Sequence, residues 1–167
     1  MRHLLDLNDL LEEELCHIYQ AENKLLDFIK QIRSKTRTGP LLDWIMIYQE
    51  LVNRHSAMIR KIFYQLFLPI EEDKTFVVED IIEEYRSAVT RTRDDSIREE
   101  ELILALTHII HYKIAAYSTL CVHARALKYW DETIGLHVAE EEEKEMAANL
   151  KFLSEKHSVF LNDWYAF

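Results

Sequence analysis

Glycine and proline, the residues that most often interrupt helices and form turns, are scarce in this chain. Each occurs only twice in 167 residues, at Gly39, Pro40, Pro69 and Gly135. A β-rich fold needs many tight turns, so a sheet is hard to build from this sequence. Long helices separated at these few positions fit the count, and hydrophobic residues at 49% can fill one core. The sequence therefore predicts a single all-α domain over residues 1–167.

Apolar residues recur at helical spacing along four long segments, as expected on the buried face of a helix. The predicted long helices cover residues 4–33, 41–68, 96–129 and 132–156, and a short amphipathic helix covers 76–89. The first stripe consists of Leu11, Leu15, Ile18, Glu22, Leu25, Ile29 and Ile32, and the second of Leu41, Ile45, Tyr48, Val52, His55, Ile59, Ile62 and Leu66. Asp94, Asp95 and Ser96 are candidate N-caps of the third long helix.

The lengths of the connections predict the topology. A few residues join the first two long helices, and a few join the last two, so each pair should form an antiparallel hairpin. Between the hairpins lie residues 69–95, and a long helix of about 28 residues spans roughly 40 Å. A connection of that size can cross from one end of the bundle to the other. The sequence therefore predicts a ferritin-like four-helix bundle, with a long crossover between the second and third helices that contains the short helix.

The charge of the chain excludes some partners. The net charge is −10 at pH 7, whereas a nucleic-acid surface needs a basic stripe, so neither a nucleic acid nor an anionic membrane is expected as a partner. Charged residues break the apolar runs well before the length of a bilayer span. The two cysteines, Cys16 and Cys121, lie inside helical segments and are expected to be core thiols in a reducing compartment. We therefore expect a cytoplasmic protein.

Ionisable side chains interrupt the apolar stripe of every long helix. Glu22 interrupts the first stripe, His55 the second and Lys113 the third, with His111 close by in the sequence. The third stripe consists of Leu106, Ile110, Lys113, Tyr117, Cys121 and Ala124. Charged residues are seldom fully buried unless they are paired or bind a metal. Carboxylates and imidazoles that point inward at one level of a bundle form di-iron and di-manganese sites. The alternatives stay open, because a single core histidine is more often hydrogen-bonded than a metal ligand.

The last long helix contains a run of four glutamates, residues 140–143. Its apolar stripe opens with Ile134 and Val138 and resumes at Met146. Because Glu142 precedes Met146 by one helical turn, it is the glutamate expected to point inward. A run of glutamates is, however, usually a solvated face.

Several segments resemble the YciE/YciF family of ferritin-like, stress-associated bacterial proteins. Residues 18–25 read IYQAENKL, which is similar to I-Y-x-A-E-K-x-L in that family, and residues 111–120 read HYKIAAYSTL, similar to H-Y-E-I-A-A-Y-G-T-L. His55 matches the histidine of an H-x-x-E-T segment, and Glu142 with Glu143 matches an E-E pair. The similarity extends over roughly residues 4–154. It implies a ferritin-like bundle, often dimeric, with a di-metal centre and no firmly assigned reaction.

The sequence departs from the family at the metal ligands. Two glutamates of the third long helix fall on Ile110 and Lys113 here, and the glutamate three after the histidine falls on Met58. The remaining family ligands are Glu22, His55, His111, Glu142 and Glu143. A di-iron site normally takes a Glu from two helices and a Glu-x-x-His motif from each of the other two. The resemblance therefore leaves too few carboxylates for two ions.

Two functions are compatible with a metal site that has lost some of its carboxylate ligands. The favoured one is a non-catalytic structural or interaction protein with a stress-associated role, in which the Lys113 ammonium replaces the metal and pairs with Glu22 and Glu142. The alternative is a protein that binds iron or manganese through Glu22, His55 and Glu142, with His111 as a helper. Enzymatic activity is not favoured; if present, it would be that of a di-iron oxidase or ferroxidase. We expect no cofactor in the favoured case and identify no small-molecule substrate.

A homodimer is expected from the apolar end of the chain. Residues 157–167 follow the last predicted helix as a tail, and its apolar members are Phe160, Leu161, Trp164, Tyr165 and Phe167. Exposed apolar patches of this size usually mark an interface. The alternative is that the tail folds back onto its own bundle.

Overall fold

The protein consists of five helices in a computed structural model that describes residues 4–36, 39–70 and 76–165. The helices are α1 (Leu7–Arg33), α2 (Pro40–Gln65), α3 (Phe76–Arg91), α4 (Asp95–Ala126) and α5 (Trp130–Tyr165). The described part of the chain contains no strand. The predicted all-α class is therefore confirmed.

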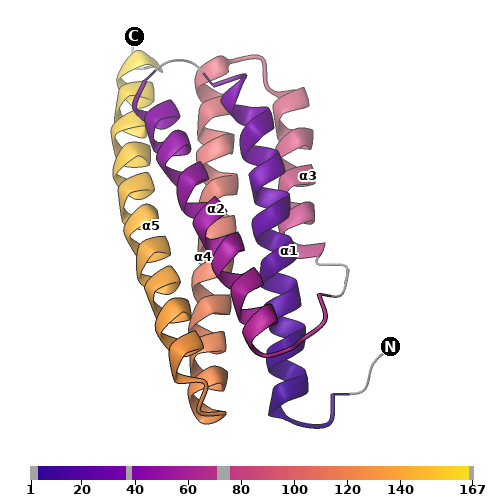
Figure 1. The fold of residues 1–167 in the computed structure, drawn as a ribbon. Coiled ribbons are helices and arrows are strands. Elements are labelled where there is room, and N and C mark those ends of the chain that lie inside the picture. Colours follow the sequence, from indigo (N-terminus) through magenta and orange to yellow (C-terminus); the bar gives the residue numbers. More distant parts are fainter. Residues whose placement is uncertain (1–3, 37–38, 71–75, 166–167) are drawn as a thin grey trace.

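The four long helices form a bundle of two antiparallel hairpins, α1–α2 and α4–α5 (Figure 1). Helix α1 packs beside α2 and α4, and α5 packs beside α4 and α2, so α1 and α5 are diagonal. The connection between α2 and α4 runs from one end of the bundle to the other and contains α3, which packs on α4 and α1 (Figure 1). The predicted ferritin-like bundle with a long crossover and a short fifth helix is confirmed.

Local sequence signals set the starts of three helices. The side chain of Asp6 accepts hydrogen bonds from the backbone N–H groups of Asn8 and Asp9, which caps α1. Asp94 caps α4 in the same way, as one of the three candidates predicted from the sequence. Gly39 has a φ of 148°, a conformation that side chains disfavour, and places Pro40 at the first position of α2.

Two helices end in a conformation that normally calls for glycine. Phe67 follows α2 with a φ of 53°, and Lys128 follows α4 with a φ of 64°. In both cases the next residue donates a backbone hydrogen bond to a carbonyl oxygen inside the helix. The N–H of Leu68 donates to the carbonyl of Phe63 at 2.9 Å, and the N–H of Tyr129 donates to the carbonyl of Ala124 at 2.9 Å. These bonds form Schellman motifs, and a non-glycine residue in the left-handed region costs about 1–2 kcal/mol. Helix α2 therefore ends three residues earlier than the predicted end at 68.

The inward face of α5 differs from the predicted one. Ile134, expected in the core stripe, is 65% exposed, and Val138 is half exposed. Apart from Glu140, the buried residues described in α5 follow steps of three and four: Thr133, Leu136, Ala139, Glu143, Met146 and Leu150. A stripe built on successive steps of four drifts around the helix by about 40° per step, since one turn takes 3.6 residues. The prediction for Ile134 and Val138 was therefore wrong.

The last helix is also longer than predicted. Helix α5 continues to Tyr165, whereas a helix end near 156 and a separate tail over 157–167 were expected. His157 belongs to this extension and contacts Glu99 at 3.2 Å and Glu100 at 2.7 Å, on the first turns of α4. The side chains of the apolar tail residues, Phe160 to Phe167, lie outside the described residues. In the described part of the chain, no helix has the length and apolar character that a bilayer crossing would require.

Candidate functional site

Each of the four long helices places an ionisable side chain at one level of the core. These are Glu22 on α1, His55 on α2, Lys113 on α4 and Glu143 on α5, all buried. Each occupies the inward stripe of its helix, so the fold brings together four groups that are far apart in the sequence. We call these four residues the charge cluster.

The ammonium of Lys113 lies between the two buried carboxylates of the cluster. Its Nζ is 2.9 Å from Oε2 of Glu22 and 2.6 Å from Oε1 of Glu143. It also lies 3.2 Å from the hydroxyl of Tyr48 and 5.0 Å from the centroid of that ring. All three donors of the ammonium thus have an oxygen within reach, as burial of a charge requires.

Two tyrosine hydroxyls satisfy the remaining carboxylate oxygens. Tyr48 donates to Oε2 of Glu143 at 2.8 Å, and Tyr117 donates to Oε1 of Glu22 at 2.5 Å. Burial, followed by the nearby carboxylates, raises the pKa of both phenols well above the usual value, so both hydroxyls keep their protons. Both residues were predicted as part of the core stripes but not as hydrogen-bonding partners. Their position between two glutamates in space cannot be read from a single helix.

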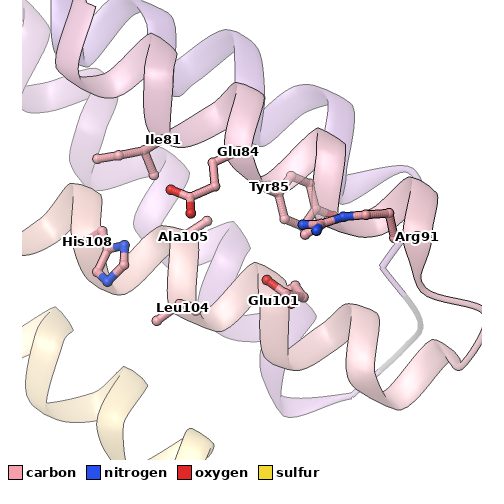
Figure 2. A pocket seen from close by; sticks show the side chains of 9 residues that line it. Ile81, Glu84, Tyr85, Arg91, Glu101, Leu104, Ala105 and His108 are labelled. Atoms are coloured by element: carbon pink, nitrogen blue, oxygen red, sulfur yellow. The ribbon is translucent and has the colours of Figure 1, made fainter.

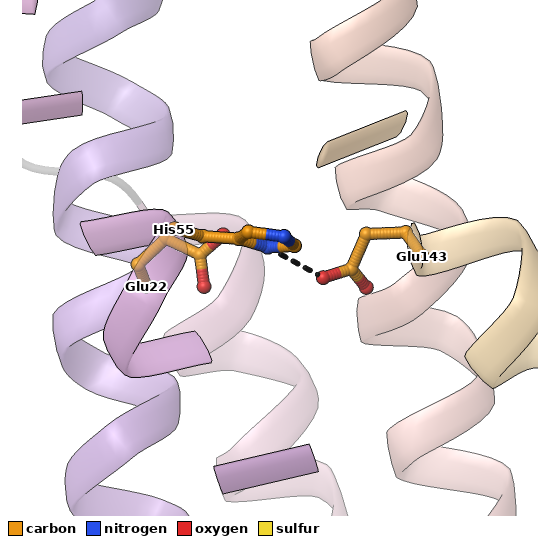
Figure 3. Close-up of side chains that lie close together, drawn as sticks. All are labelled: Glu22, His55 and Glu143. Carbon is orange, nitrogen blue, oxygen red and sulfur yellow. Dashed lines mark ion pairs between the residues drawn. The ribbon is translucent and has the colours of Figure 1, made fainter. Parts of the chain in front are cut away.

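Both ring nitrogens of His55 face carboxylates. Nδ1 lies 3.1 Å from Oε1 of Glu143 and 3.6 Å from Oε1 of Glu22 (Figure 3). On the other side of the ring, Nε2 lies 2.9 Å from Oε2 of Glu142. Burial alone would lower the pKa of His55, but the nearby carboxylates of Glu143 and Glu22 outweigh it and raise the pKa to about 9. His55 is therefore a cation at neutral pH.

The charges of the cluster balance one another. Burial opposes the charged form of Lys113, but Glu143 and Glu22 raise its pKa above the usual value. Burial likewise opposes ionisation of Glu143, but Lys113 and His55 lower its pKa. The cluster thus holds two cations, Lys113 and His55, and the carboxylates of Glu22 and Glu143. A buried set of this kind is stable only while every member keeps its partner.

Glu142 takes a different place from the one predicted. Its side chain is 32% exposed, whereas that of Glu143 is fully buried. Glu142 bridges Nε2 of His55 and the exposed guanidinium of Arg54, each at 2.9 Å. The predicted pair of Lys113 with Glu22 is present, but its second carboxylate is Glu143 and not Glu142. The cause is the register of α5, in which position 143 and not 142 faces the core.

His111 lies outside the charge cluster. It is exposed and lines a shallow groove of about 410 Å³ between α4 and α5, together with Ile114, Lys144 and Ala147. Residues two apart on a helix point in nearly opposite directions, so His111 and Lys113 cannot face the same core. The structure therefore does not bring His111 to the predicted site.

A second groove, of about 220 Å³, lies between α3 and α4 (Figure 2). Ile81 and Ala105 contribute apolar surface to it, and Glu84, Glu101 and His108 surround it in Figure 2. No residue of the charge cluster lines this groove or the one at His111. Neither groove therefore gives a small molecule access to the cluster.

A family model described as a domain of unknown function, DUF892, matches residues 6–159. The chain belongs to the DUF892 family. Protein YciF of Escherichia coli is 27% identical over 139 residues, which make up 83% of this chain and 84% of YciF. This similarity confirms the resemblance inferred from residues 18–25 and 111–120.

Solved structures of similar proteins agree with the fold. The crystal structure of the Escherichia coli stress protein YciF matches with a TM-score of 0.87 at 25% identity, covering 93% of this chain and 98% of YciF. YcfI of Rhodopseudomonas palustris matches with a TM-score of 0.85 at 21% identity, covering 90% of this chain and 96% of YcfI. A Xanthomonas campestris protein reaches 0.69 at 18% identity and covers 97% of this chain and 100% of its own. The last two likenesses show the shared fold alone.

The residues present do not fit a centre of two metal ions. Glu22, His55 and Glu143 do offer ligand atoms that all lie within 4.8 Å of one another. Lys113 Nζ, however, contacts both carboxylates, so an incoming divalent ion would meet a positive charge at that place. The third long helix supplies Ile110 and Lys113 where a two-ion centre needs carboxylates. The ammonium thus takes the role of a cation that bridges the two glutamates.

Proposed function

We propose that this DUF892 protein is a non-catalytic structural or interaction protein in which a buried ion-pair network replaces a metal centre. One observation carries the proposal: Lys113 Nζ lies 2.9 Å from Glu22 and 2.6 Å from Glu143. The Lys113 ammonium, a cation attached to the chain itself, pairs with both carboxylates without a metal. The network then joins α1, α4 and α5 in one bundle whatever the metal supply.

The state of the polar groups argues against catalysis at this site. The carboxylates of Glu22 and Glu143 are engaged by Lys113, His55 and the two tyrosine hydroxyls. A general acid or base needs a reacting group within hydrogen-bond reach, and a redox metal needs an open position for its substrate. The proposed role is therefore architectural, and no di-iron oxidase or ferroxidase step is assigned to the cluster.

A single iron or manganese site is the second candidate. The three ligand atoms of Glu22, His55 and Glu143 within 4.8 Å of one another favour it. Such a site would require Lys113 to swing away and His55 to lose its proton, because only a neutral imidazole binds a metal. Both steps oppose the raised pKa values of Lys113 and His55.

A stress-associated role in the cytoplasm is part of the proposal. Its support is the similarity to YciF, which is described as a stress protein. An ion-pair network that needs no metal suits a protein that must keep its fold when metal supply changes.

Thermal denaturation with and without added metal tests the proposal. We expect the melting temperature of the native protein to stay unchanged when Mn²⁺, or Fe²⁺ without oxygen, is added. We expect the Lys113→Ala variant to gain stability from the same ions, because Glu22, His55 and Glu143 then face a space without a cation. A rise in melting temperature for the native protein would favour the single-metal candidate. A Lys113→Ala variant that ignores metal would show that the lysine does not stand in for an ion.

A further inference from the structure

The groove between α3 and α4 is lined by one face of each helix (Figure 2). Its lining includes Ile81 and Glu84 of α3, and Glu101, Leu104, Ala105 and His108 of α4. The four residues of α4 follow the spacing i, i+3, i+4 and i+7, which places them on one side of that helix. We call this space of about 220 Å³ the α3–α4 groove. No residue of the charge cluster lines it, so its chemistry is separate from that of the proposed function.

Two carboxylates in the α3–α4 groove have no counterion. Glu84 extends from α3 toward α4, and Glu101 lies on the α4 side of the groove (Figure 2). Among the residues that the structure describes, neither carboxylate forms a hydrogen bond or an ion pair. Arg91 lines the groove as well, and its Nε donates to the backbone carbonyl of Ser87 at 3.4 Å. Two carboxylates and one guanidinium leave one net negative charge in the groove when His108 is neutral.

The groove also offers a neutral acceptor and apolar surface. His108 is exposed and, like the two glutamates, has no hydrogen-bond partner in the described part of the chain. A neutral imidazole provides one acceptor nitrogen. Ile81 and Ala105 contribute apolar surface, and Leu104 is 50% exposed. A complementary ligand therefore needs a positive charge with hydrogen-bond donors at one end and a hydrocarbon part at the other.

We propose that the α3–α4 groove binds a small primary amine in its ammonium form, with a short hydrocarbon chain packed on the apolar side chains of the groove. An ammonium carries three N–H donors, and Glu84, Glu101 and the imidazole of His108 provide acceptors for them. Its single positive charge equals the net negative charge of the groove. Lys113 shows the same chemistry in the core, because its ammonium contacts two carboxylates and a hydroxyl.

The size of the groove limits the ligand. Its volume of about 220 Å³ lies below the range of about 300–1,000 Å³ that is typical of sites for drug-sized ligands, so a short-chain amine fits better than a large one. A divalent metal ion fits less well. Among the described residues, Glu84, Glu101 and His108 do not form a group whose ligand atoms all lie within 4.8 Å of one another. Contacts with both helices would let a bound amine fasten α3 to α4.

A nuclear magnetic resonance titration of the full, isotope-labelled chain tests the proposal, with hexylamine as the probe. Hexylamine is an ammonium ion at neutral pH, as a lysine side chain is. We expect the amide signals of residues 81–91 and 101–108 to move and to saturate with a dissociation constant of about 1 mM or lower. Shifts that lie mainly outside α3 and α4, or that do not saturate by about 20 mM, would overturn the proposal.

Two comparison compounds test which part of the amine is recognised. Hexan-1-ol has the same hydrocarbon chain without the charge, and hexyltrimethylammonium keeps the charge but has no N–H donor. We expect each to bind at least about tenfold more weakly than hexylamine, because the carboxylates recognise a charged donor. Equal affinity for either compound would show that the groove does not select a primary amine.

Glutamine substitutions separate the groove from the general negative charge of the protein. Glu84→Gln and Glu101→Gln each remove one charge at nearly constant size, and both should fold, because neither carboxylate has a partner in the described chain. We expect each to weaken hexylamine binding by about tenfold. Glu145→Gln is the matched control, since Glu145 is exposed on α5 and does not line the groove. A loss of affinity in Glu145→Gln as large as in Glu84→Gln would refute binding by the groove.

Discussion

Lys113 Nζ lies 2.6 Å from Oε1 of Glu143, and both side chains are fully buried in the interior of the bundle. The contact joins α4 to α5, the two helices of the second hairpin. A second contact, to Glu22 at 2.9 Å, extends the network to α1. Because these groups are buried, the network stabilises the fold only while all of its members are present.

Loss of the central cation should be costly. We expect Lys113→Ala to lower the free energy of unfolding by about 3–5 kcal/mol, because Glu22 and Glu143 are left buried without their counterion. Urea unfolding followed by circular dichroism measures this. Lys144→Ala is the matched control, since the exposed Lys144 contacts Glu140 and Glu141 at 2.8 Å and its loss should leave the midpoint almost unchanged. Equal losses for both variants would contradict the role assigned to Lys113.

Stability should fall between about pH 6.5 and 9 because of His55. The pKa of this histidine is about 9 in the folded protein and near 6.5 when unfolded, so the folded state binds its proton more tightly. The contribution to stability is complete below about pH 6.5 and is lost as pH rises through about 9. The loss attributable to His55 should approach about 3 kcal/mol.

Unfolding free energies of native, His55→Gln and His111→Gln proteins across this range measure the effect. His111 is exposed and outside the cluster, so His111→Gln should keep the native pH dependence. His55→Gln should flatten it. A His55→Gln variant with the native slope would show that another group titrates.

A glycine at the positive-φ position that follows α2 or α4 should stabilise the protein. Lys128 holds a φ of 64° and Phe67 a φ of 53°, a region that only glycine adopts without strain. We expect Lys128→Gly to raise the free energy of unfolding by up to about 1 kcal/mol, visible as a higher melting temperature. Lys128→Ala keeps the strain and should give no such gain. Destabilisation by the glycine would mean that the Lys128 side chain matters more than its backbone.

Restoring the missing carboxylates should restore a metal requirement. Ile110 and Lys113 are both fully buried on α4, and Glu at both positions would add two ligands to Glu22, His55 and Glu143. We expect the variant Ile110→Glu with Lys113→Glu to be less stable than the native protein without metal. Its melting temperature should rise as Mn²⁺ or Fe²⁺ is added. A double variant that does not respond to either ion would show that the site is misplaced.

The sequence predicted the first three long helices well because successive apolar residues in them are three or four residues apart. Glu22, His55 and Lys113 therefore fell on the correct faces. On α5 the run of glutamates carries no apolar signal, and the buried Ala139 gives a weak one, so the register was shifted and Glu142 was chosen over Glu143. Which glutamate of such a run points into the core can be recognised only from its neighbours in space.

Other features of the site depend on contacts between helices. Tyr48 and Tyr117 lie on the predicted stripes, but their hydrogen bonds to Glu143 and Glu22 arise only when the hairpins pack together. The exact last residues of α2 and α4 had no glycine signal, because Phe67 and Lys128 occupy positions where glycine is the usual marker. Helix α5 extends through residues with no helix breaker, so its end at Tyr165 could not be predicted from turn residues.

The metal content of the native protein tests the central claim most directly. The protein would be produced in medium supplemented with iron and manganese, purified without chelators, and measured by elemental analysis per chain. We expect far less than one ion per chain, because Lys113 holds the place between Glu22 and Glu143. One or two ions per chain, lost together with stability on chelation, would contradict the replacement of the metal by Lys113.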